Sequence, residues 1–522
     1  MPSNNAITLQ DLCFSWPDGQ HVLAGLNGAF SAGRTGLVGA NGSGKSTLLR
    51  LIAGQLRPSG GRVGVDGEVA YLAQDLTLDV NASVADLLGV ADKLAAIAAI
   101  EAGESDPVFF DVLADDWGVA ARAQQALAQV GLPELAMDRR LGELSGGEGM
   151  LVALAGLITG QAPITLLDEP TNNLDQRARQ AVYQVVRGWK RTLIVVSHDI
   201  DLLELMDNTA ELYNQRLTVF GGPYSAWQQA VSAQQQTAVQ AVQTARAALR
   251  VEKRQRQATE QALAHTAKKA KKDEANKRAP LIAMHSWAQD AQVSAGKLRG
   301  RMDDRVETAR QALAEAEAQT RPDEHILIDL PDPKVPAKRR LAELHVAGQV
   351  TILQGPQRLA ITGPNGAGKT TLLEQLVHDT APLAGQPWGK LFTRRFGYLP
   401  QRADGLDPSS SAVDQVGRVA PHATQAELRG QLAKMYLRGD AALRPIKSLS
   451  GGERFRVVLA TLILATPPAE LLILDEPTNN LDLPSVTQLI DALNTYRGAL
   501  IIVSHDEHFL EQLAPISRIE LG

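Results

Sequence analysis

One nine-residue motif occurs twice in this chain of 522 residues and constrains its fold more than any other feature. It reads GANGSGKST from Gly39 and GPNGAGKTT from Gly363. Both copies match G-x-x-x-x-G-K-[ST], in which glycines let successive backbone N–H groups face phosphate groups. The helix that begins at the lysine adds the positive end of its dipole. The chain is therefore predicted to form two phosphate-binding loops, each joining a strand to a helix.

Four further motifs follow each loop in the same order. They are YLAQ and YLPQ, LSGGE in both copies, LLDEPTNNLD and ILDEPTNNLD, and VVSHD and IVSHD. The Asp and the His of the last two motifs are 30 residues apart in both copies, from Asp168 to His198 and from Asp475 to His505. Repetition of this kind indicates a duplicated structural unit.

The two copies differ in length at one place. Lys45 and Lys369 are 324 residues apart, whereas Ser145 and Ser450 are 305 residues apart. The first copy therefore carries 19 extra residues, and they fall within 75–143, where two Ala-rich and Leu-rich segments are predicted to be helices.

Each repeat is predicted to have an α/β fold. Short apolar runs such as PITLLDE and LIVVSHD are typical of buried parallel strands that end in polar residues. The chemistry of such sheets lies at the carboxyl ends of the strands.

The segment between the repeats has a different composition. It is rich in Ala, Gln, Lys and Arg, and about fifty residues pass without Gly or Pro before Pro280. We expect two long antiparallel helices with a basic turn region at about 265–301. The predicted domains are therefore 1–222 for the first repeat, 223–322 for the hairpin and 323–522 for the second repeat.

The charge of the chain is unevenly distributed. Residues 241–310 hold 16 Lys and Arg against 8 Asp and Glu, although the whole chain has a net charge of -6. A basic segment in an acidic chain indicates contact with a polyanion, and the alternative is a solvated helical face. Given the two nucleotide-binding repeats around it, RNA is the favoured partner, through salt-dependent contacts with phosphates. The residues predicted to contact RNA are Lys268, Lys269, Lys271, Lys272, Lys277, Arg278, Lys297, Arg299 and Arg301. His285 and Trp287 either stack on a base or pack within the hairpin.

The polar residues of the motifs suit phosphoryl transfer. Lys45 and Lys369 are expected to reach the β- and γ-phosphates, and Ser46 and Thr370 to ligate Mg²⁺. Asp168 and Asp475, at strand ends, can hold Mg²⁺ through water. Glu169 and Glu476 are placed to orient an attacking water, and His198 and His505 to sense the γ-phosphate. Such a reaction needs mainly placement and charge stabilisation.

The complete motif set resembles the ATP-binding cassette (ABC) ATPases. Two cassettes with a basic helical pair between them resemble the ABC-F family in particular, and the resemblance covers the whole chain. It implies an α/β fold with two ABC-type P-loop NTPase domains joined by a long α-helical hairpin. ATP and Mg²⁺ are the implied cofactors, and ATP hydrolysis is the implied activity. The implied partners are the ribosome, its rRNA and the peptidyl-tRNA, and the implied role is in translation or in antibiotic resistance.

The resemblance also implies that the cassettes pair head to tail, so that the signature of one closes the nucleotide on the loop of the other. The first nucleotide site would then combine Trp16, Gly39, Asn41, Gly42, Gly44, Lys45, Ser46, Thr47, Gln74, Asp168, Glu169 and His198 with Ser450, Gly451 and Gly452. The second would combine Gly363, Asn365, Gly366, Gly368, Lys369, Thr370, Thr371, Gln401, Asp475, Glu476 and His505 with Ser145, Gly146 and Gly147. Gln74 and Gln401 are also counted among the expected metal ligands.

The two nucleotide sites are predicted to be unequal. The second signature continues with Arg454 and Arg456, whereas the first continues with Gly149 and Leu151. Trp16 can stack on adenine in the first cassette, and the stretch IDLPDPKVPAKRR, interpreted as its counterpart, offers no aromatic residue. Both differences fall on the second site, which is therefore expected to hydrolyse ATP more slowly. The alternative is that Leu151 merely packs.

Several features limit the other possibilities. The chain has a single cysteine, no visible signal peptide and no run of 18 apolar residues, so we expect a cytoplasmic protein without a membrane-spanning segment. Because one chain supplies both cassettes, we expect a monomer. Two alternatives stay open, the energising subunit of an ABC transporter and a DNA-associated ATPase. The basic hairpin argues against the transporter subunit. The DNA-associated ATPase is disfavoured because the chain stops soon after the second cassette.

Overall fold

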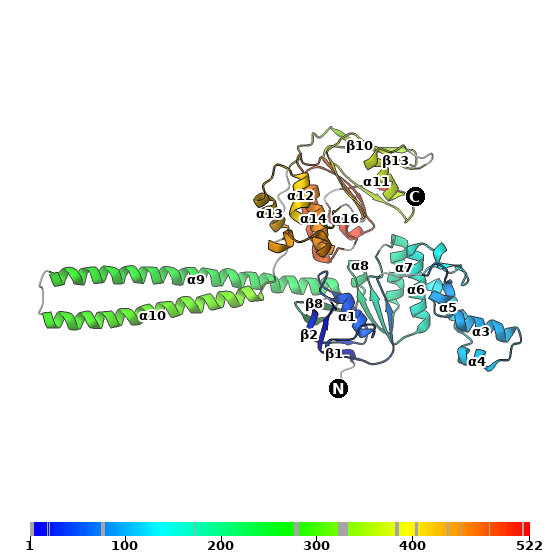
Figure 1. Cartoon of the computed structure of the whole chain (residues 1–522), viewed down its shortest axis with the longest axis horizontal. Helices are drawn as coiled ribbons and strands as arrows, with labels where there is room; N and C mark the ends of the chain where they lie inside the picture. Colours follow the sequence, from blue (N-terminus) through cyan, green and yellow to red (C-terminus); the bar gives the residue numbers. More distant parts are fainter. Residues whose placement is uncertain are drawn as a thin grey trace. The chain divides into compact units, whose positions relative to one another are not determined.

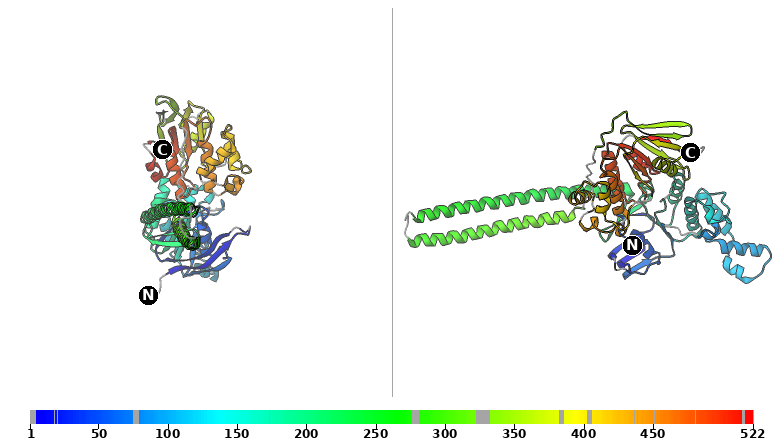
Figure 2. Two further views of the ribbon diagram at one scale, coloured as in Figure 1. Left: turned by 90° about the vertical axis from the view of Figure 1, so that its left-hand side faces the viewer. Right: turned by 45° about the horizontal axis from the view of Figure 1, so that its top comes forward.

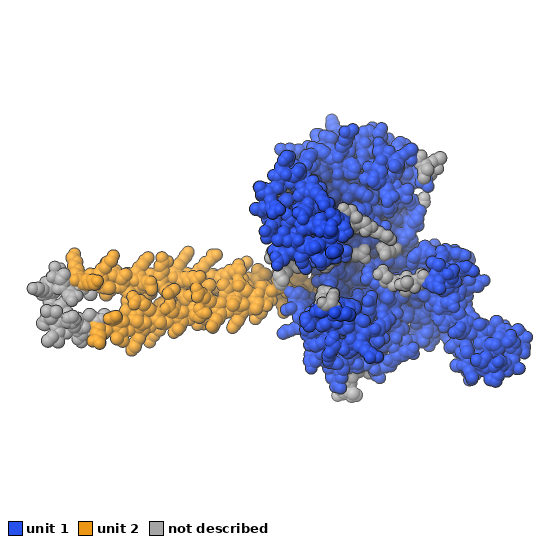
Figure 3. All heavy atoms as spheres, in the orientation of Figure 1, with its two compact units in different colours: residues 1–224, 324–522 blue, residues 225–323 orange. Residues whose placement is uncertain are grey.

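The structure is a computed structural model of the whole chain (Figure 1). It describes residues 5–17, 19, 21–74, 79–172, 174–275, 281–321, 332–381, 386–401, 406–435, 437, 439–449, 451–479, 481–513 and 516–521. Contacts divide the chain into two compact units, residues 1–224 with 324–522 and residues 225–323 (Figure 3). The division into three domains, with its two predicted boundaries, stays a prediction.

The first cassette is built on two sheets. A six-stranded sheet has the order β5-β6-β7-β3-β8-β9, in which only β9 runs antiparallel to its neighbour, and a three-stranded antiparallel sheet has the order β2-β1-β4. The strands are β1 (Asn5–Ser15), β2 (His21–Ser31), β3 (Arg34–Val38), β4 (Gly60–Val65), β5 (Val69–Leu72), β6 (Ile164–Asp168), β7 (Thr192–Val196), β8 (Asn208–Tyr213) and β9 (Arg216–Gly221). The helices are α1 (Lys45–Ile52), α2 (Val84–Leu87), α3 (Ala91–Glu101), α4 (Pro107–Leu113), α5 (Val119–Gln129), α6 (Gly146–Gly160), α7 (Gln176–Arg187) and α8 (Ile200–Leu203).

The second cassette repeats this topology. Its five-stranded parallel sheet has the order β14-β15-β16-β12-β17, and its antiparallel sheet has the order β11-β10-β13. The strands are β10 (Arg340–Val346), β11 (Gln349–Gln354), β12 (Arg358–Thr362), β13 (Trp388–Leu391), β14 (Phe396–Leu399), β15 (Leu471–Asp475), β16 (Ala499–Val503) and β17 (Ser517–Glu520). The helices are α11 (Lys369–His378), α12 (Ala412–Val419), α13 (Gln425–Lys434), α14 (Gly451–Ile463), α15 (Leu483–Thr495) and α16 (Glu507–Gln512).

Both parallel sheets are buried on their two faces, as the apolar runs predict. Alternate residues of β7 point to different clusters: Leu193 and Val195 pack with α6 and α7, whereas Ile194 and Val196 pack with α1. All five residues of β6, β7, β15 and β16 are buried. The α/β class with two cassettes is therefore confirmed.

The extra residues of the first cassette form the helical pair α3–α4. Matching bridges flank the region in both cassettes, between Ser83 and Arg140 and between Ser411 and Pro445. The bridged residues are 57 positions apart in the first cassette and 34 in the second. Because α2 and α5 have counterparts in α12 and α13, the added length falls on α3 and α4, which pack on each other.

The second unit is a pair of antiparallel helices, α9 (Tyr224–Ala275) and α10 (Leu281–Gln319), which lie side by side in all views (Figure 2). Ion pairs of 2.8 Å join them at three levels: Arg246–Glu317, Arg256–Asp303 and Arg305–Glu252. The prediction of a turn region at about 265–301 was wrong in extent. Residues 265–275 and 281–301 are helical, because their composition favours helix up to the vicinity of Pro280.

Among the helices described, none is both long enough and apolar enough to cross a membrane.

Candidate nucleotide sites

Each phosphate-binding loop connects a central strand to a helix. The first loop leaves β3 and enters α1 at Lys45, and the second leaves β12 and enters α11 at Lys369. The Lys45 ammonium donates to the carbonyls of Gly39 (2.6 Å) and Ala40 (3.2 Å). The Lys369 ammonium donates to the equivalent carbonyls of its own loop, each at 2.8 Å. Burial lowers the pKa of both lysines. The predicted strand–loop–helix connection is thus present in both cassettes, and phosphate binding by the loops stays a prediction.

The first glycine of each loop is required by a close backbone approach. Gly39 has a φ of 154° and Gly363 a φ of 143°. A Cβ atom would lie 2.5 Å from the Leu212 carbonyl oxygen at Gly39 and 2.1 Å from the Leu521 carbonyl oxygen at Gly363. Each loop is therefore packed against the carboxyl end of the neighbouring strand, at Leu212 in β8 or at Leu521 just after β17.

A hydroxyl and a carboxylate meet below the first loop. Ser46 donates to one oxygen of Asp168 and Tyr71 to the other, both at 3.1 Å. In the second cassette the Thr370 hydroxyl is the side-chain partner that opposes the effect of burial on the pKa of Asp475, whose side chain is 1% exposed. Burial raises the pKa of both aspartates. Buried carboxylate oxygens beside a hydroxyl are oxygen ligands of the kind that Mg²⁺ prefers, so these residues fit that ion.

A glutamate and a histidine form a matched pair in each cassette. The backbone N–H of His198 donates to Glu169 at 3.3 Å, and the N–H of His505 donates to Glu476 at the same distance. The ring Nε2 atoms also lie 3.3 Å from the other oxygen of each carboxylate. In the second cassette this ring contact is not aligned as a hydrogen bond. In each cassette, a glutamate and a histidine that are 29 residues apart in the sequence are thus in contact.

Burial sets the protonation of these pairs. It raises the pKa of Glu169 to about 8 and that of Glu476 to about 7. It lowers the pKa of His198 to about 3 and that of His505 to about 4. Both histidines are therefore neutral near pH 7, and both glutamates titrate in the range in which a general base works best.

The glutamates also have an uncommon backbone conformation. Glu169 has a φ of 51° and Glu476 a φ of 46°. The left-handed region is disfavoured for residues other than glycine, and such strain collects at functional sites. Each glutamate N–H is paired with the neighbouring strand, with Val196 or Val503, at 2.8 Å. The strained turn aims the carboxylate away from the strand that carries it.

An open pocket of about 430 Å³ surrounds the first loop. Its lining includes Trp16 and Val22 beside the loop, with Gln74, Glu169 and His198 across from them. The Trp16 ring is held edge-on by Phe14, with 5.0 Å between ring centroids. Trp16 therefore lies beside the loop, and its stacking on adenine stays a prediction.

The counterpart of Trp16 in the second cassette was wrongly assigned. Trp16 follows β1 in the connection to β2, and the equivalent connection joins β10 to β11 through Ala347 and Gly348. The stretch IDLPDPKVPAKRR precedes β10 instead, and part of it lies outside the described residues. Neither Ala347 nor Gly348 is aromatic, so the β10–β11 turn offers no counterpart of Trp16. The expected difference between the two sites therefore stays a prediction, but for a different reason.

The signatures are placed at helix N-termini. Ser145 caps α6 and forms a capping box with Glu148. Gly451 and Gly452 begin α14, and Ser450 lies outside the described residues. The described residues that line the pocket at the first loop all come from the first cassette. Closure of each site by the opposite signature therefore stays a prediction. Leu151 is 6% exposed and packs in the core, as the alternative interpretation holds.

Two aspartates that sequence reasoning did not assign to the sites link the cassettes. The Asp482 carboxylate accepts from the backbone N–H of Asn41 at 2.7 Å, and Asp175 accepts from that of Asn365 at 3.4 Å. Each aspartate also caps the helix that follows it, α15 or α7. The signal was available, because the motif NNLD ends in this aspartate in both copies.

The predicted RNA contacts lie on the hairpin. Lys268, Lys269, Lys271 and Lys272 are exposed on α9, and Lys297, Arg299 and Arg301 are exposed on α10. Lys277 and Arg278 lie outside the described residues, as do the side chains of His285 and Trp287.

Comparisons with known proteins give one consistent result. A family model described as ABC transporter matches residues 23–172 and 349–479. The chain is 32% identical to the tylosin resistance ATP-binding protein TlrC of Streptomyces fradiae, over 94% of this chain and 92% of that protein. It is 30% identical to ATP-binding cassette sub-family F member 3 of Mus musculus, over 94% of this chain and 68% of that protein.

Solved structures share the fold at lower identity. The archaeal ribosome recycling factor aABCE1, in a complex with the ribosomal stalk protein aP1, aligns with a TM-score of 0.53 and 17% identity. A structure described as RNase-L Inhibitor aligns with a TM-score of 0.54 and 18% identity. Each alignment covers 97% of this chain and 86% of the other.

Proposed function

The chain belongs to the ABC-F family of tandem ATP-binding cassette ATPases, and we propose that it binds the ribosome through its basic hairpin under the control of ATP. The observation that carries the proposal is the run of exposed lysines and arginines on α9 and α10, between two complete sets of ATPase motifs. Phosphate contacts by exposed Lys and Arg supply affinity without reading sequence, which suits the rRNA surface.

The names of relatives support a role at the ribosome. One relative is named for resistance to tylosin, and one structural neighbour is a ribosome recycling factor bound to a stalk protein. Another neighbouring structure is a model of ribosome-bound Pelota and ABCE1. For this chain we propose that the hairpin acts near the peptidyl-tRNA, in translation or in protection against ribosome-targeting antibiotics.

In the proposed sites, each residue has one task. Lys45 and Lys369 hold the β- and γ-phosphates, and the loop N–H groups surround them. Ser46 and Asp168, with Thr370 and Asp475 in the second cassette, would hold Mg²⁺, with Gln74 and Gln401 beside them; the ion would neutralise phosphate charge when bound.

Hydrolysis itself is assigned to the glutamate and histidine pairs. Glu169 and Glu476 orient the attacking water and accept its proton, for which their raised pKa values are suited. The neutral rings of His198 and His505 keep the carboxylates in place and can donate to the γ-phosphate. Both roles depend on the strained turn that brings each glutamate to its histidine.

The deciding experiment is sucrose-gradient sedimentation of the Glu169→Gln, Glu476→Gln variant with ribosomes and ATP. This variant keeps the phosphate-binding groups and removes both bases, so we expect it to co-migrate with ribosomes and to be released by high salt. If it stays at the top of the gradient, the ribosome proposal is wrong, and the transporter and DNA alternatives return.

A matched pair of charge changes tests the hairpin. Lys268→Glu, Lys269→Glu and Lys271→Glu together should release the protein from ribosomes. Arg250→Glu, Lys253→Glu and Arg254→Glu change the same charge at exposed positions elsewhere on α9 and should leave binding largely intact. Equal loss in both would show that only the total charge of the hairpin matters, and the proposed contact segment would be abandoned.

Turnover of the single glutamate variants tests the inequality of the sites. With Glu476→Gln only the first site hydrolyses ATP, and with Glu169→Gln only the second does. We expect Glu169→Gln to lose more of the total ATPase rate, because the second site lacks an aromatic platform. Equal losses would contradict the inequality.

A further inference from the structure

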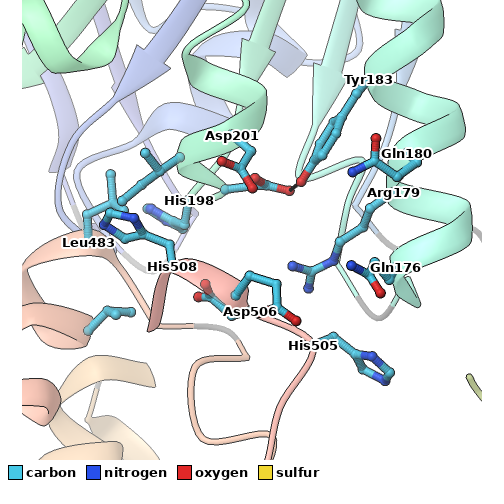
Figure 4. A pocket seen from close by; sticks show the side chains of 14 residues that line it. Gln176, Arg179, Gln180, Tyr183, His198, Asp201, Leu483, His505, Asp506 and His508 are labelled. Carbon is cyan, nitrogen blue, oxygen red and sulfur yellow. Dashed lines mark hydrogen bonds between the residues drawn. The ribbon is translucent and has the colours of Figure 1, made fainter. Parts of the chain in front are cut away.

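A small cavity lies where the last motifs of the two cassettes meet (Figure 4). Its volume is about 60 Å³. The first cassette contributes Arg179 and Tyr183 from α7 together with His198 and Asp201, and the second contributes Val486, His505, Asp506 and His508. Among the chemical groups assigned to ATP hydrolysis, only the two histidines line it. The other polar side chains of this cavity have no role in the function proposed above.

The duplicated sequence supplies a direct comparison within this cavity. Arg179 is the fourth residue after Asp175, and Val486 is the fourth residue after Asp482. Both aspartates are N-caps, of α7 and α15, so the two residues occupy equivalent positions one turn into equivalent helices. Both line the same cavity. The first cassette therefore presents a guanidinium where the second presents an apolar side chain.

The position of the guanidinium is fixed by its own segment. The Arg179 Nε–H donates to the Leu174 carbonyl at 3.1 Å, across the N-terminus of α7. From there the side chain extends towards the segment of the second cassette that carries His505 and Asp506 (Figure 4). Leu174 immediately precedes Asp175, which contacts the second loop at Asn365. Arg179 thus extends from the crossing segment of one cassette into the cavity that the histidine turn of the other cassette also lines.

The electrostatic environments of the two sites differ accordingly. The positive charge of Arg179 acts on Glu476 and on His505, and it opposes the effect of burial on the glutamate. At both sites a carboxylate of the opposite cassette also acts on the histidine, Asp482 on His198 and Asp175 on His505, so the difference between the sites is the guanidinium of Arg179. A fixed positive charge beside a buried site favours negative charge there, and a water-poor environment strengthens the effect.

We propose that Arg179 is a positioning residue of the second nucleotide site, supplied by the first cassette. It holds the turn of His505 and the crossing segment of Asp175 in register, and it adds a positive charge that the first site does not receive, because Val486 occupies the equivalent position. Hydrolysis at the second site therefore depends on Arg179, whereas hydrolysis at the first site does not. This inference rests on the roles proposed above for Glu169 and Glu476.

The test measures ATP turnover in two backgrounds, without ribosomes. In the Glu169→Gln background, Arg179→Gln should lower kcat of the second site about tenfold, less than the loss of a direct transition-state donor, and should change KM by less than about twofold. Arg179→Lys should recover a large part of the rate, because it restores the charge. In the Glu476→Gln background, Arg179→Gln should leave turnover at the first site unchanged.

Arg177→Gln is the matched control, since Arg177 is exposed on the same helix and does not line the cavity. It should leave turnover unchanged in both backgrounds. An equal fall of both sites with Arg179→Gln would indicate a general structural effect and overturn the proposal, as would a change confined to KM. A Lys variant as slow as the Gln variant would exclude the charge as the cause.

Failure of this inference is distinguishable from failure of the proposed function. Sedimentation measures ribosome binding independently of ATP turnover. If the glutamate assignment were wrong, each single Glu→Gln variant would keep the full ATPase rate before any change at Arg179. In that case Arg179→Gln in the otherwise unaltered chain must still lower total turnover. If total turnover stayed the same, the proposal would be overturned.

Discussion

At the residue scale, the second site shows how a buried carboxylate is prepared for catalysis. Asp475 lies at the end of a fully buried strand, and the next residue, Glu476, turns into the left-handed region to reach His505. Burial of such groups opposes the folded state unless a charge partner is present. The same arrangement recurs around Glu169. Both cassettes therefore keep a buried, strained carboxylate that destabilises the folded state, which indicates a function in each of them.

Trp16 gives a prediction at this scale. Trp16→Ala should weaken ATP at the first site by about tenfold, because stacking of a base on an aromatic ring contributes about 1–3 kcal/mol. Isothermal titration of ATP into the doubly blocked Glu169→Gln, Glu476→Gln protein should then resolve one weakened and one unchanged site.

The nature of the contact can be checked with GTP. Stacking tolerates any base, so GTP should lose affinity to a similar degree at the first site. If Trp16→Ala left both sites unchanged for ATP, the ring would be a packing residue of β1 beside Phe14 and not a base platform.

At the scale of elements, few of the hairpin side chains that the structure describes are buried. Val242 and Val306 are 8% and 5% exposed, and three ion pairs join the helices along their length. Exposed ion pairs contribute little each, about 0–1 kcal/mol, so the apolar contacts matter more.

Val242→Asp should therefore loosen the hairpin, because it places a charge at a buried position. Limited proteolysis should cut within residues 225–323 faster than in the unaltered protein, while ATP binding is kept. Val251→Asp is the matched control, since Val251 lies on the same helix and is 50% exposed. Equal cleavage of the two variants would contradict a hairpin held by its apolar contacts.

At the scale of the whole molecule, each crossing aspartate contacts the phosphate-binding loop of the opposite cassette. Asp482 contacts Asn41 at 2.7 Å, whereas Asp175 contacts Asn365 at 3.4 Å. Hydrogen bonds from a backbone N–H to a carboxylate strengthen as they shorten and as they are buried. Asp482 is 6% exposed, so its charge acts in a water-poor environment.

Asp482→Asn keeps an oxygen that can cap α15 but removes the charge at the first loop. Turnover of the first site, measured with Glu476→Gln, should fall several-fold. Asp175→Asn, measured at the second site with Glu169→Gln, should have a smaller effect because its contact is longer. The reverse order would show that these contacts do not set the rates.

Features of the fold and of the sites could be predicted from the sequence when they depend on residues close together in the chain. The loops, the strand-end acids and the histidines were all assigned from motifs, since each motif is a local backbone device with fixed residue requirements. The long helices followed from composition. The extent of α9 and α10 was underestimated, because a basic run gives no local signal of where a helix ends when Pro280 alone marks the break.

The sequence by itself determined the fold class and the duplication, and it supplied the residues proposed to bind and hydrolyse a nucleotide, because these depend on periodicity and on short motifs. Only the tertiary structure decided which residues cross between cassettes, which turn corresponds to Trp16, and that Arg179 and Val486 face one cavity. Those facts depend on segments about 190 to 440 residues apart, and no local pattern reports which distant side chains will share a buried space.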